Sequence, residues 1–479
     1  MGISLCMIVK NEEDWIEGAL ESVRSVVDEI IIADTGCTDS TLQRAERFSP
    51  QVLNVQWNDS FADARNCTLA EARHPWILVL DADERIAARD LPRFADAINR
   101  GEDGYHLVQR NYVFGNQVFG WSPNAGEYPE GNPYPGYVDN PLIRFFRNSP
   151  ELRFRGAVHE IIDPHRLPTH LRFGNAPIVM HHYGKVRDRE RVASKQRMYL
   201  ALGLKKVQED PKNPKAWFDL GIQYQELNEH AEASPCFEKT FAMTKIPVSL
   251  LYWAISEKQR GLHTNAIELL ERALRLGLDS FDVHLEIGNV QLALGHLDKA
   301  LEHYKRCLKS HPRNPVAVFN CGLALRKMGD ARAAEEHYVM AVQLDPTFDT
   351  AALELASLRD AAGRYLEAAD VLRPLLERAP DLRAARLTLA KIHIQTNRTA
   401  EALELLENAS SNDAVANSLL GAAYLQANNL DKAQERLESA LRLDRSLVDV
   451  RINLAQLYER KGDFARAKRF RASAALALR

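Results

Sequence analysis

Short apolar runs alternate with helical patterns over the first 80 residues of the chain. Apolar residues recur at helical spacing at Trp15, Ile16, Leu20 and Val23, and a second helix is expected over 61–73. The apolar runs expected as strands cover 3–9, 27–33, 51–57 and 76–80. Strands that alternate with helices are typical of βαβ units, so this region predicts an α/β domain with a parallel sheet covered by helices.

Polar clusters follow the expected strands at the points where the strands end. Lys10-Asn11-Glu12 comes after the first run, Asp34 to Asp39 after the second, and Asp81-Ala82-Asp83 after the fourth. In parallel sheets ligands bind outside the carboxyl ends of the strands. The pattern therefore predicts a binding site at this edge of the sheet.

Asp81 and Asp83 are candidates for a metal site. A strand alternates its faces, so we expect the two carboxylates to point the same way from the strand end. Paired carboxylates repel each other unless a cation lies between them, and Mg²⁺ or Mn²⁺ prefer such oxygen ligands. The alternative is a helix start, with Asp81 or Asp83 as the N-cap before Glu84-Arg85-Ile86.

The pattern becomes less regular after residue 100. Strands are expected at 105–110 and 178–180, and a pair of strands at 142–146 and 154–162. Between them, 115–137 is rich in glycine and proline, which predicts a long binding loop or lid, with a disordered insertion as the alternative. The aromatic residues in this loop favour a surface that grips a ligand; they are Phe119, Trp121, Tyr128, Tyr134 and Tyr137.

From about Arg187 the chain is helical throughout and repeats itself every 31 to 34 residues. A small residue marks each repeat: Gly221, Ala254, Gly288, Gly322, Ala356, Ala390, Gly421 and Ala455. Twelve positions later stands an alanine in every case: Ala233, Ala266, Ala300, Ala334, Ala368, Ala402, Ala433 and Ala467. Four further on, seven of the eight repeats carry an aromatic residue or leucine: Phe237, Leu270, Tyr304, Tyr338, Leu372, Leu406 and Leu437.

This spacing resembles the tetratricopeptide repeat, whose opening signature fits Trp217, Leu220, Gly221 and Tyr224. The small residues allow two helices to cross closely, and stacked repeats form a solenoid with a concave face. We expect about eight repeats over 214–479, a linker helix within 187–213, and the α/β domain over 1–186. Arg471 replaces an apolar residue in the last repeat, as suits a polar end.

Composition narrows the class of protein further. The net charge is −4 with 26% charged residues, so no nucleic-acid partner is expected. No apolar run approaches the roughly 20 residues needed to cross a bilayer, so we expect no membrane span. The six cysteines lack metal-type spacing, and we expect reduced thiols in a cytoplasmic protein.

Residues 1–186 resemble the inverting family-2 glycosyltransferases with the Rossmann-like GT-A fold, and most of all the branch with the bacterial peptide S-glycosyltransferases. Several enzymes that join this domain to such repeats resemble protein O-glycosyltransferases. The resemblance rests on six motifs in order: 4–13, Asp34-Thr35-Gly36 with Asp39, Arg65-Asn66, Asp81-Ala82-Asp83-Glu84, Val158-His159-Glu160 and His182-Tyr183-Gly184. Cys37 stands where the family usually has serine, which the turn should tolerate.

The resemblance implies a site for a nucleotide sugar and for Mn²⁺ or Mg²⁺. Arg65 would meet the diphosphate, with a surface ion pair to Asp63 or Glu71 as the alternative. The metal would be held by Asp81, Asp83 and His182, with His181 left as an alternative and a purely structural histidine as another. The implied nucleotide-sugar site comprises Ile8, Lys10, Asn11, Glu12, Asp34, Gly36, Asp39, Arg65, Asn66, Asp81, Ala82 and Asp83.

An inverting transfer needs a base to take the proton of the acceptor. Glu160 is the best candidate, beside His159; the alternative is that Glu160 only orients Arg144, Arg153 or Arg155. Asp83 would act through the metal. The implied reaction moves sugar from a UDP-sugar to a protein acceptor, such as flagellin, recruited by the repeats. The rival hypotheses are transfer to a lipid-linked or cell-wall glycan, and a scaffold with a vestigial transferase domain.

Overall fold

The structure is a computed structural model that describes residues 2–114, 121–124, 126–156, 160–163, 167–186, 189–407 and 412–477. It divides into two compact units, Met1–Ser310 and His311–Arg479. The first unit contains an α/β domain and the beginning of a helical array, and the second contains only helices. The predicted order, an α/β domain followed by an all-α repeat region, is confirmed.

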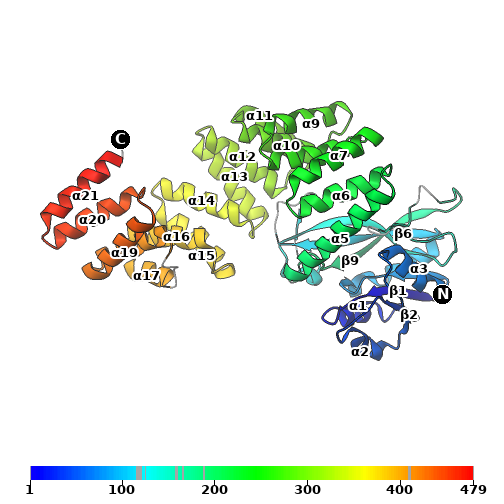
Figure 1. The fold of residues 1–479 in the computed structure, drawn as a ribbon. Coiled ribbons are helices and arrows are strands. Elements are labelled where there is room, and N and C mark those ends of the chain that lie inside the picture. The colour runs from blue at the N-terminus through cyan, green and yellow to red at the C-terminus, as the bar shows by residue number, and fades with distance from the viewer. Residues whose placement is uncertain are drawn as a thin grey trace. The chain divides into compact units, whose positions relative to one another are not determined.

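Within the described residues, nine strands of the first unit form one mixed sheet (Figure 1). The strands follow the order β3-β2-β1-β4-β8-β6-β9-β5, and β7 pairs with β8. Strands β1 to β4 are parallel, as the βαβ pattern predicted, whereas β8 is antiparallel to both β4 and β6. The bounds are Ile3–Val9 (β1), Glu29–Asp34 (β2), Gln51–Asn54 (β3), Trp76–Val79 (β4), Glu84–Ile86 (β5), Gly104–Val113 (β6), Ser122–Pro123 (β7), Gly136–Arg147 (β8) and Phe173–His182 (β9).

The alternating side chains of β1 divide the core into two layers. Leu5 and Met7 pack on one face with Leu20 of α1 and Phe94 of α4, while Cys6 packs on the other face with helix α3. Apolar burial on both faces explains why these strands read as continuous apolar runs. The helices of this domain are α1 (Ile16–Val23), α2 (Thr41–Ala45), α3 (Phe61–Glu71) and α4 (Arg93–Arg100), with short 3₁₀ turns η1 (Glu46–Phe48), η2 (Ala88–Asp90) and η3 (Pro129–Gly131).

Two expectations for the region after residue 100 are wrong. The run at 142–146 belongs to the 12-residue strand β8, which pairs with β4 on one side and along the whole of the 10-residue β6 on the other. In the described part of 154–162, the backbone makes an isolated bridge between Arg155 and Ile161 and no strand. Residues 157–159, which include the motif positions Val158 and His159, lie outside the described residues.

The segment 115–137 is only partly described, since 115–120 and 125, and with them Phe119, lie outside the described residues. Its described part packs against the sheet and does not form an open gripping surface. Trp121 and Tyr128 are buried, and Tyr137 lies 3.6 Å under the guanidinium of Arg110. Tyr134 is half-buried and stacks on Tyr112, with ring centroids 5.1 Å apart. The aromatic residues therefore fasten the segment to β6 and β8.

Helix α5 (Arg189–Glu209) follows the α/β domain, close to the linker helix that the sequence predicted. It packs on the first turn of α3: the rings of Tyr199 and Phe61 are 5.7 Å apart, and Nζ of Lys205 lies 2.9 Å from Asp59. The start of the helical array is thereby attached to the helix that carries Arg65.

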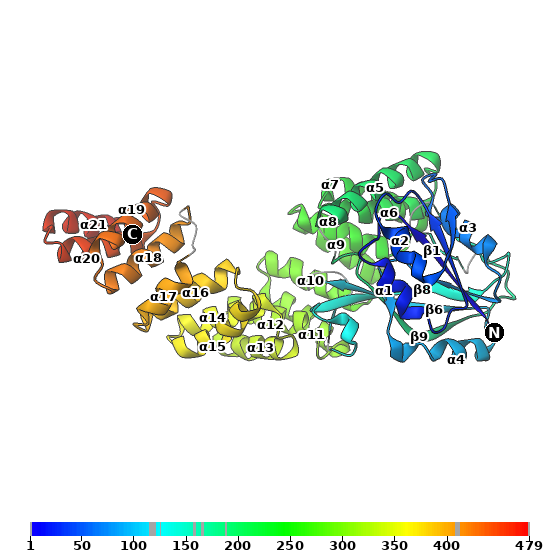
Figure 2. The ribbon, with the colours of Figure 1, turned by 90° about the horizontal axis from the view of Figure 1, so that it is seen from below.

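Sixteen described helices follow as eight consecutive pairs. Within each unit successive helices pack against one another, and Figure 2 shows the pairs of the second unit in sequence from α12 to α21. The pairs are α6 (Pro214–Glu226) and α7 (His230–Thr244), α8 (Val248–Gln259) and α9 (His263–Arg275), α10 (Phe281–Ala293) and α11 (Leu297–Ser310), α12 (Pro315–Lys327) and α13 (Ala331–Leu344), α14 (Asp349–Ala361) and α15 (Tyr365–Arg378), α16 (Arg383–Gln395) and α17 (Thr399–Leu406), α18 (Ala414–Gln426) and α19 (Leu430–Leu443), and α20 (Val448–Arg460) and α21 (Phe464–Ala477).

In six of the eight repeats the small residue is matched to the side chain that crosses it; Gly421, which stands opposite Leu437, is an exception. Glycine stands opposite an aromatic ring in three repeats, as Gly322 does opposite Tyr338, whereas alanine stands opposite leucine in three others, as Ala356 does opposite Leu372. A Cβ at position 322 would lie 2.7 Å from Cε1 of Tyr338, closer than packed atoms tolerate. A methyl group is thus accepted only where the opposing side chain is smaller than a ring.

This match predicts a rescue. Gly322→Ala should destabilise the protein by about 1–3 kcal/mol through overpacking, even though alanine favours helix. Adding Tyr338→Leu should recover most of that loss, because Leu faces Ala in other repeats and the buried Tyr338 hydroxyl has no hydrogen-bond partner. Urea unfolding of both single variants and the double variant measures the coupling. Additive losses would show that the crossing does not select glycine.

Candidate functional site

The loops after β1 and β2 are joined by hydrogen bonds at the carboxyl edge of the sheet. Val9 is in register with Asp34, and beyond them the backbone N–H of Thr38 donates to Oδ1 of Asn11 (2.7 Å). The N–H of Glu12 donates to Oγ1 of Thr41 (2.6 Å). The predicted residues Lys10, Asn11, Glu12, Asp34, Gly36 and Asp39 are thus brought to one edge, with Ile8 half-buried on β1 behind them.

Three of these predicted side chains shape the loops themselves. Oδ1 of Asp34 accepts from the N–H groups of Gly36 (3.0 Å) and Cys37 (2.8 Å), a turn that places Gly36 at φ +106°. Glycine adopts this conformation without the strain that a side chain would bring. Asp39 accepts from Glu13 N–H, and Asn11 binds Thr38, so both hold the two loops together. Lys10 is exposed beside them.

The acidic segment after β4 is a turn, and it does not start a helix. The N–H of Glu84 donates to the carbonyl of Asp81 (3.0 Å), and Glu84–Ile86 then forms β5 against β9. The helix-cap alternative is therefore wrong. Because the strand has ended before Asp81, its side-chain alternation does not govern Asp83, and the two carboxylates take different partners. Ala82 between them is buried.

Asp81 faces two arginines from different elements. Nη2 of Arg65, on α3, lies 2.7 Å from Oδ1 of Asp81, and Nη2 of Arg144, on β8, lies 3.4 Å from Oδ2. Nε of Arg65 also donates to Oε1 of Glu160 (2.6 Å). Arg65 is thus a buried bridge between two carboxylates, and the alternative of a surface pair with Asp63 or Glu71 is wrong. Glu160 orients Arg65, and its described contacts include none of the three arginines named as alternatives.

The charges of this cluster fix each other's protonation. Burial alone would raise the pKa of Asp81, but the Arg65 and Arg144 guanidiniums outweigh it and hold that pKa at about 2. Burial would lower the pKa of Arg65, but Asp81 and Glu160 keep it above the ordinary value. Burial, reinforced by the charge of Asp81, raises the pKa of Glu84, whose oxygens accept from Asp81 N–H (2.8 Å) and Gln109 (2.6 Å).

The depressed pKa of Asp81 predicts a loss of stability in acid. A carboxyl group at about 2 in the folded state against 3.8 unfolded stabilises the protein by about 2 kcal/mol above pH 4. That contribution is lost as the pH falls from about 4 to about 2. Urea unfolding at pH 5 and pH 2.5 should show a smaller fall in stability for Asp81→Asn than for the wild type. Equal falls would contradict this role of Asp81.

His182 and Asp83 face each other beside this cluster. Nε2 of His182 lies 3.3 Å from Oδ2 of Asp83, and Nδ1 lies 2.6 Å from Oδ1 of Asn111. The amide nitrogen of Asn111 donates to the carbonyls of Gln109 and Val138, so its oxygen must accept the proton of Nδ1. In the neutral imidazole Nε2 then offers a lone pair to the space that the Asp83 carboxylate also faces.

The neighbouring His181 lies in a different environment. It is fully buried, and its Nδ1 is 2.7 Å from the hydroxyl of Tyr112. Burial and the nearby Arg110 and Arg89 lower the pKa of His181 to about 3, so the ring stays neutral. Of the two histidines that the motif left open, His182 is therefore the one placed beside Asp83.

The pair Asp83 and His182 fits a divalent cation in its chemistry. A carboxylate oxygen and an imidazole nitrogen with its proton fixed on the far side are a usual ligand pair, and they suit Mn²⁺ better than Mg²⁺. Over the described residues, no group of three or more His, Cys, Asp or Glu side chains is placed to hold a metal. Asp81, the third ligand expected from the sequence, faces the arginines. Further ligands would have to come from substrate or water.

Asn111 escaped the sequence reasoning, which named Gly184 and Arg144 without a role in the donor site, and the structure gives Asn66 a different place. A Cβ on Gly184 would lie 2.6 Å from Nε2 of His182 and 3.0 Å from Oδ2 of Asp83, so only glycine leaves this space open. Asn111 and Arg144 come from β6 and β8, and no local pattern signals them. The Asn66 amide exchanges two 3.0 Å hydrogen bonds with the Phe154 backbone, and so anchors the segment that leads to Glu160.

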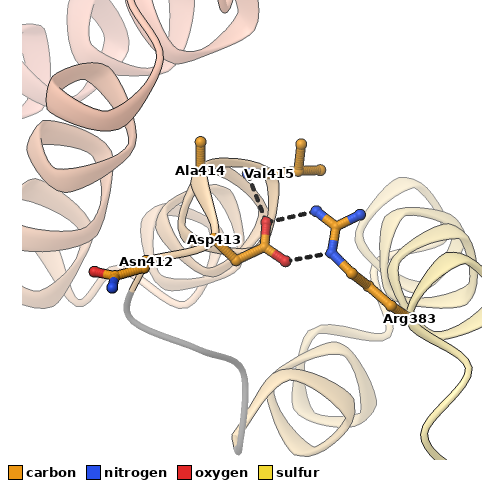
Figure 3. A pocket seen from close by; sticks show the side chains of 5 residues that line it. All are labelled: Arg383, Asn412, Asp413, Ala414 and Val415. Atoms are coloured by element: carbon orange, nitrogen blue, oxygen red, sulfur yellow. Dashed lines mark hydrogen bonds and ion pairs between the residues drawn. The ribbon is translucent and has the colours of Figure 1, made fainter.

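A separate polar hollow of about 290 Å³ lies in the second unit (Figure 3). Both oxygens of Asp413 accept from Arg383, at 2.6 and 2.8 Å, and Oδ1 also accepts from the first N–H groups of α18. Because the charges are already paired and the carboxylate caps a helix, this hollow fits a structural role.

Comparison with known proteins agrees with this division of the chain. Residues 4–181 match the family described as Glycosyl transferase family 2. Tetratricopeptide repeat families match over 251–381 and 361–477. Over the described residues, no helix is long and apolar enough to cross a membrane.

Two curated relatives cover parts of the chain. A TPR repeat-containing protein of Synechococcus elongatus is 34% identical over 193 residues, which are 39% of this chain and 43% of that protein. The SPbeta prophage-derived glycosyltransferase SunS of Bacillus subtilis is 27% identical over 244 residues, which are 50% of this chain and 53% of that protein. The matches thus span about half the length of these relatives. A tetratricopeptide repeat protein from Parabacteroides merdae covers 51% of this chain and 98% of its own at 16% identity, with a TM-score of 0.38. By its domains, the chain joins a glycosyltransferase domain of family 2 to an array of tetratricopeptide repeats.

Proposed function

We propose that this chain is a metal-dependent inverting glycosyltransferase that moves a sugar from a nucleotide-sugar donor, a UDP-sugar, to a protein acceptor. The observation that carries the proposal is the pair Asp83 and His182, 3.3 Å apart, next to the buried Arg65 at the carboxyl edge of a family-2 domain. A metal-binding pair beside a buried cation suits a diphosphate, which carries several negative charges.

Different residues of the chain would bind the donor and activate the acceptor. The loops joined through Asn11 and Asp39, together with Asp34, would receive the nucleoside, and Arg65 would bind a phosphate oxygen. Bound Mn²⁺ or Mg²⁺, held by Asp83 and His182, would supply Lewis acidity to the departing nucleoside diphosphate. Glu160 would take the proton of the acceptor group as it attacks the anomeric carbon, which gives inversion in a single displacement.

The protein acceptor is inferred from the repeats. The first helices of successive pairs lie side by side, as α14, α16, α18 and α20 do, and so line one face of the array. Solenoids of this kind offer extended surfaces that bind peptides or partner proteins. All six cysteines are free thiols, which supports a reducing cytoplasmic setting.

A donor screen tests the proposal. Full-length protein with Mn²⁺ is incubated with UDP-, GDP- and TDP-sugars, and release of the nucleoside diphosphate is measured with and without cell protein as acceptor. We expect one donor class to bind and to label a protein, and chelation to stop both. No release and no nucleotide-induced thermal shift with any donor would reject a transferase.

A shortened chain tests the role of the repeats. A variant that ends at Ser310, the boundary of the first compact unit, should keep donor binding and slow donor hydrolysis but lose transfer to protein. Undiminished transfer by this variant would show that the removed repeats do not recognise the acceptor. Transfer by both forms to a lipid-linked acceptor alone would favour the glycan hypothesis.

A further inference from the structure

Arg144, which the sequence suggests only as a partner of Glu160, is a buried cation. It lies on β8, the antiparallel strand beside β4, and its side chain is only 8% exposed. Arg65 reaches Asp81 from α3, and its side chain is 5% exposed. Figure 2 labels both α3 and β8. The two guanidiniums meet at Asp81, one on each carboxylate oxygen, and Asp81 itself is 25% exposed. The cluster therefore opens to solvent at the carboxylate.

Each guanidinium keeps one group unused. Nη1 of Arg65 and Nη1 of Arg144 are buried and have no hydrogen-bond partner. A buried, charged N–H group that has no acceptor is unfavourable. Two such groups on adjacent arginines therefore suggest that a bound ligand supplies the acceptor. Because a guanidinium is a planar fork, a free Nη1 next to an engaged Nη2 suits an oxyanion with several oxygens.

The charges leave room for an anion once a divalent cation is bound. Arg65 has a carboxylate to itself in Glu160, at 2.6 Å, and shares Asp81 with Arg144. Among the described residues Arg144 pairs with Asp81 at the longer distance of 3.4 Å, and its charge also acts on the buried Glu84. A divalent cation at Asp83 and His182 would add two positive charges beside them. With that cation, the metal and the two arginines carry four positive charges against three on Asp81, Glu160 and Asp83, and burial raises the pKa of the fourth carboxyl group, Glu84. The site therefore suits a diphosphate when the metal is bound.

We propose that Arg144 is a second diphosphate-binding residue, which forms with Arg65 a two-guanidinium site for the leaving group. Asp81 holds the two forks in position and leaves the metal to Asp83 and His182. This assignment deepens the proposed function and rests on it, since the diphosphate is that of the nucleotide-sugar donor. It predicts that Arg144 acts on the phosphate part of the donor and not on the nucleoside.

Calorimetric titration of the full chain in Mn²⁺ with inorganic pyrophosphate and, separately, with uridine tests the assignment. Arg144→Gln should weaken pyrophosphate binding at least tenfold and leave uridine binding unchanged. Arg144→Lys, which keeps the charge but not the fork, should lose less and also guards against misfolding of the glutamine variant. Arg147→Gln is the matched control, because Arg147 lies on the same strand with 45% exposure and pairs with Asp103.

The outcomes separate this inference from the function that it rests on. If the wild type binds pyrophosphate and both Arg144 variants bind it equally well, Arg144 is not a diphosphate ligand, although the transferase proposal stands. If pyrophosphate and uridine binding fall together in both variants, Arg144 is structural and the inference is overturned. If the wild type binds neither pyrophosphate nor any nucleoside diphosphate, the inference and the proposed function both fall.

Discussion

Replacing Asp83 with asparagine should lower sugar transfer by roughly 10²- to 10³-fold or more, with little change in fold. The amide keeps the size of the side chain but removes the charge that, with Nε2 of His182, would hold the cation. Asparagine is the right substitution because Asp83 is buried, with a side chain only 6% exposed, so that alanine would leave a cavity. The loss should follow Mn²⁺ affinity, which electron paramagnetic resonance titration of free Mn²⁺ measures directly.

Asp96→Asn is the matched control, since Asp96 is exposed on α4 in the same domain. It should keep both Mn²⁺ affinity and transfer. Asp81→Asn should fall between the two: Mn²⁺ binding is retained while transfer declines, because Asp81 contacts the arginines. If the Asp83→Asn variant transferred sugar at the wild-type rate, the metal would have no part in the mechanism. If Asp81→Asn lost as much Mn²⁺ affinity as Asp83→Asn, Asp81 would be a metal ligand.

The parts of the fold that the sequence predicts are those set by local pattern. Continuous apolar runs identify β1, β2 and β4, and parallel order places their carboxyl ends together, so the meeting of the loops after β1 and β2, where Asn11 binds Thr38, follows from the runs alone. The repeats are predicted for a similar reason: each crossing needs a small residue at one fixed place. The domain limits at 186 and 213 remain predictions. The first compact unit ends at Ser310, after the first three helix pairs, so its boundary does not test them.

The parts that the sequence does not predict depend on strands far apart in the chain. Arg144 reaches Asp81 only because β8 pairs antiparallel with β4, and Asn111 reaches His182 only because β6 lies beside β9. Neither pairing leaves a local signature. The same limit explains why Asp81 and Asp83 do not point the same way, as strand alternation would predict. The strand has ended before Asp81, and the hydrogen bond from Glu84 N–H to the Asp81 carbonyl turns the chain there. His182 was found through the resemblance, since a histidine pair at a strand end carries no signal by itself.

Glu160→Gln should lower transfer by roughly 10²- to 10⁴-fold while nucleoside diphosphate affinity stays within about twofold. Oε1 of Glu160 accepts from Arg65 at 2.6 Å, and an amide oxygen can take over that contact. The described contacts leave Oε2 without a partner, so this oxygen is the one available for the acceptor proton. A loss confined to transfer, with nucleoside diphosphate binding retained, would identify this carboxylate as the base.

The two roles of Glu160 give different results. If the carboxylate only orients Arg65, glutamine should weaken nucleoside diphosphate binding and transfer by the same factor. Glu151→Gln, at an exposed position before the same segment, controls for loss of negative charge nearby. Arg65→Lys adds the converse test, because it should weaken diphosphate binding whether or not Glu160 is the base. If the Glu160→Gln variant kept full transfer, a group other than Glu160 would have to take the acceptor proton. The proposed donor site would remain, but its base would have to be sought elsewhere.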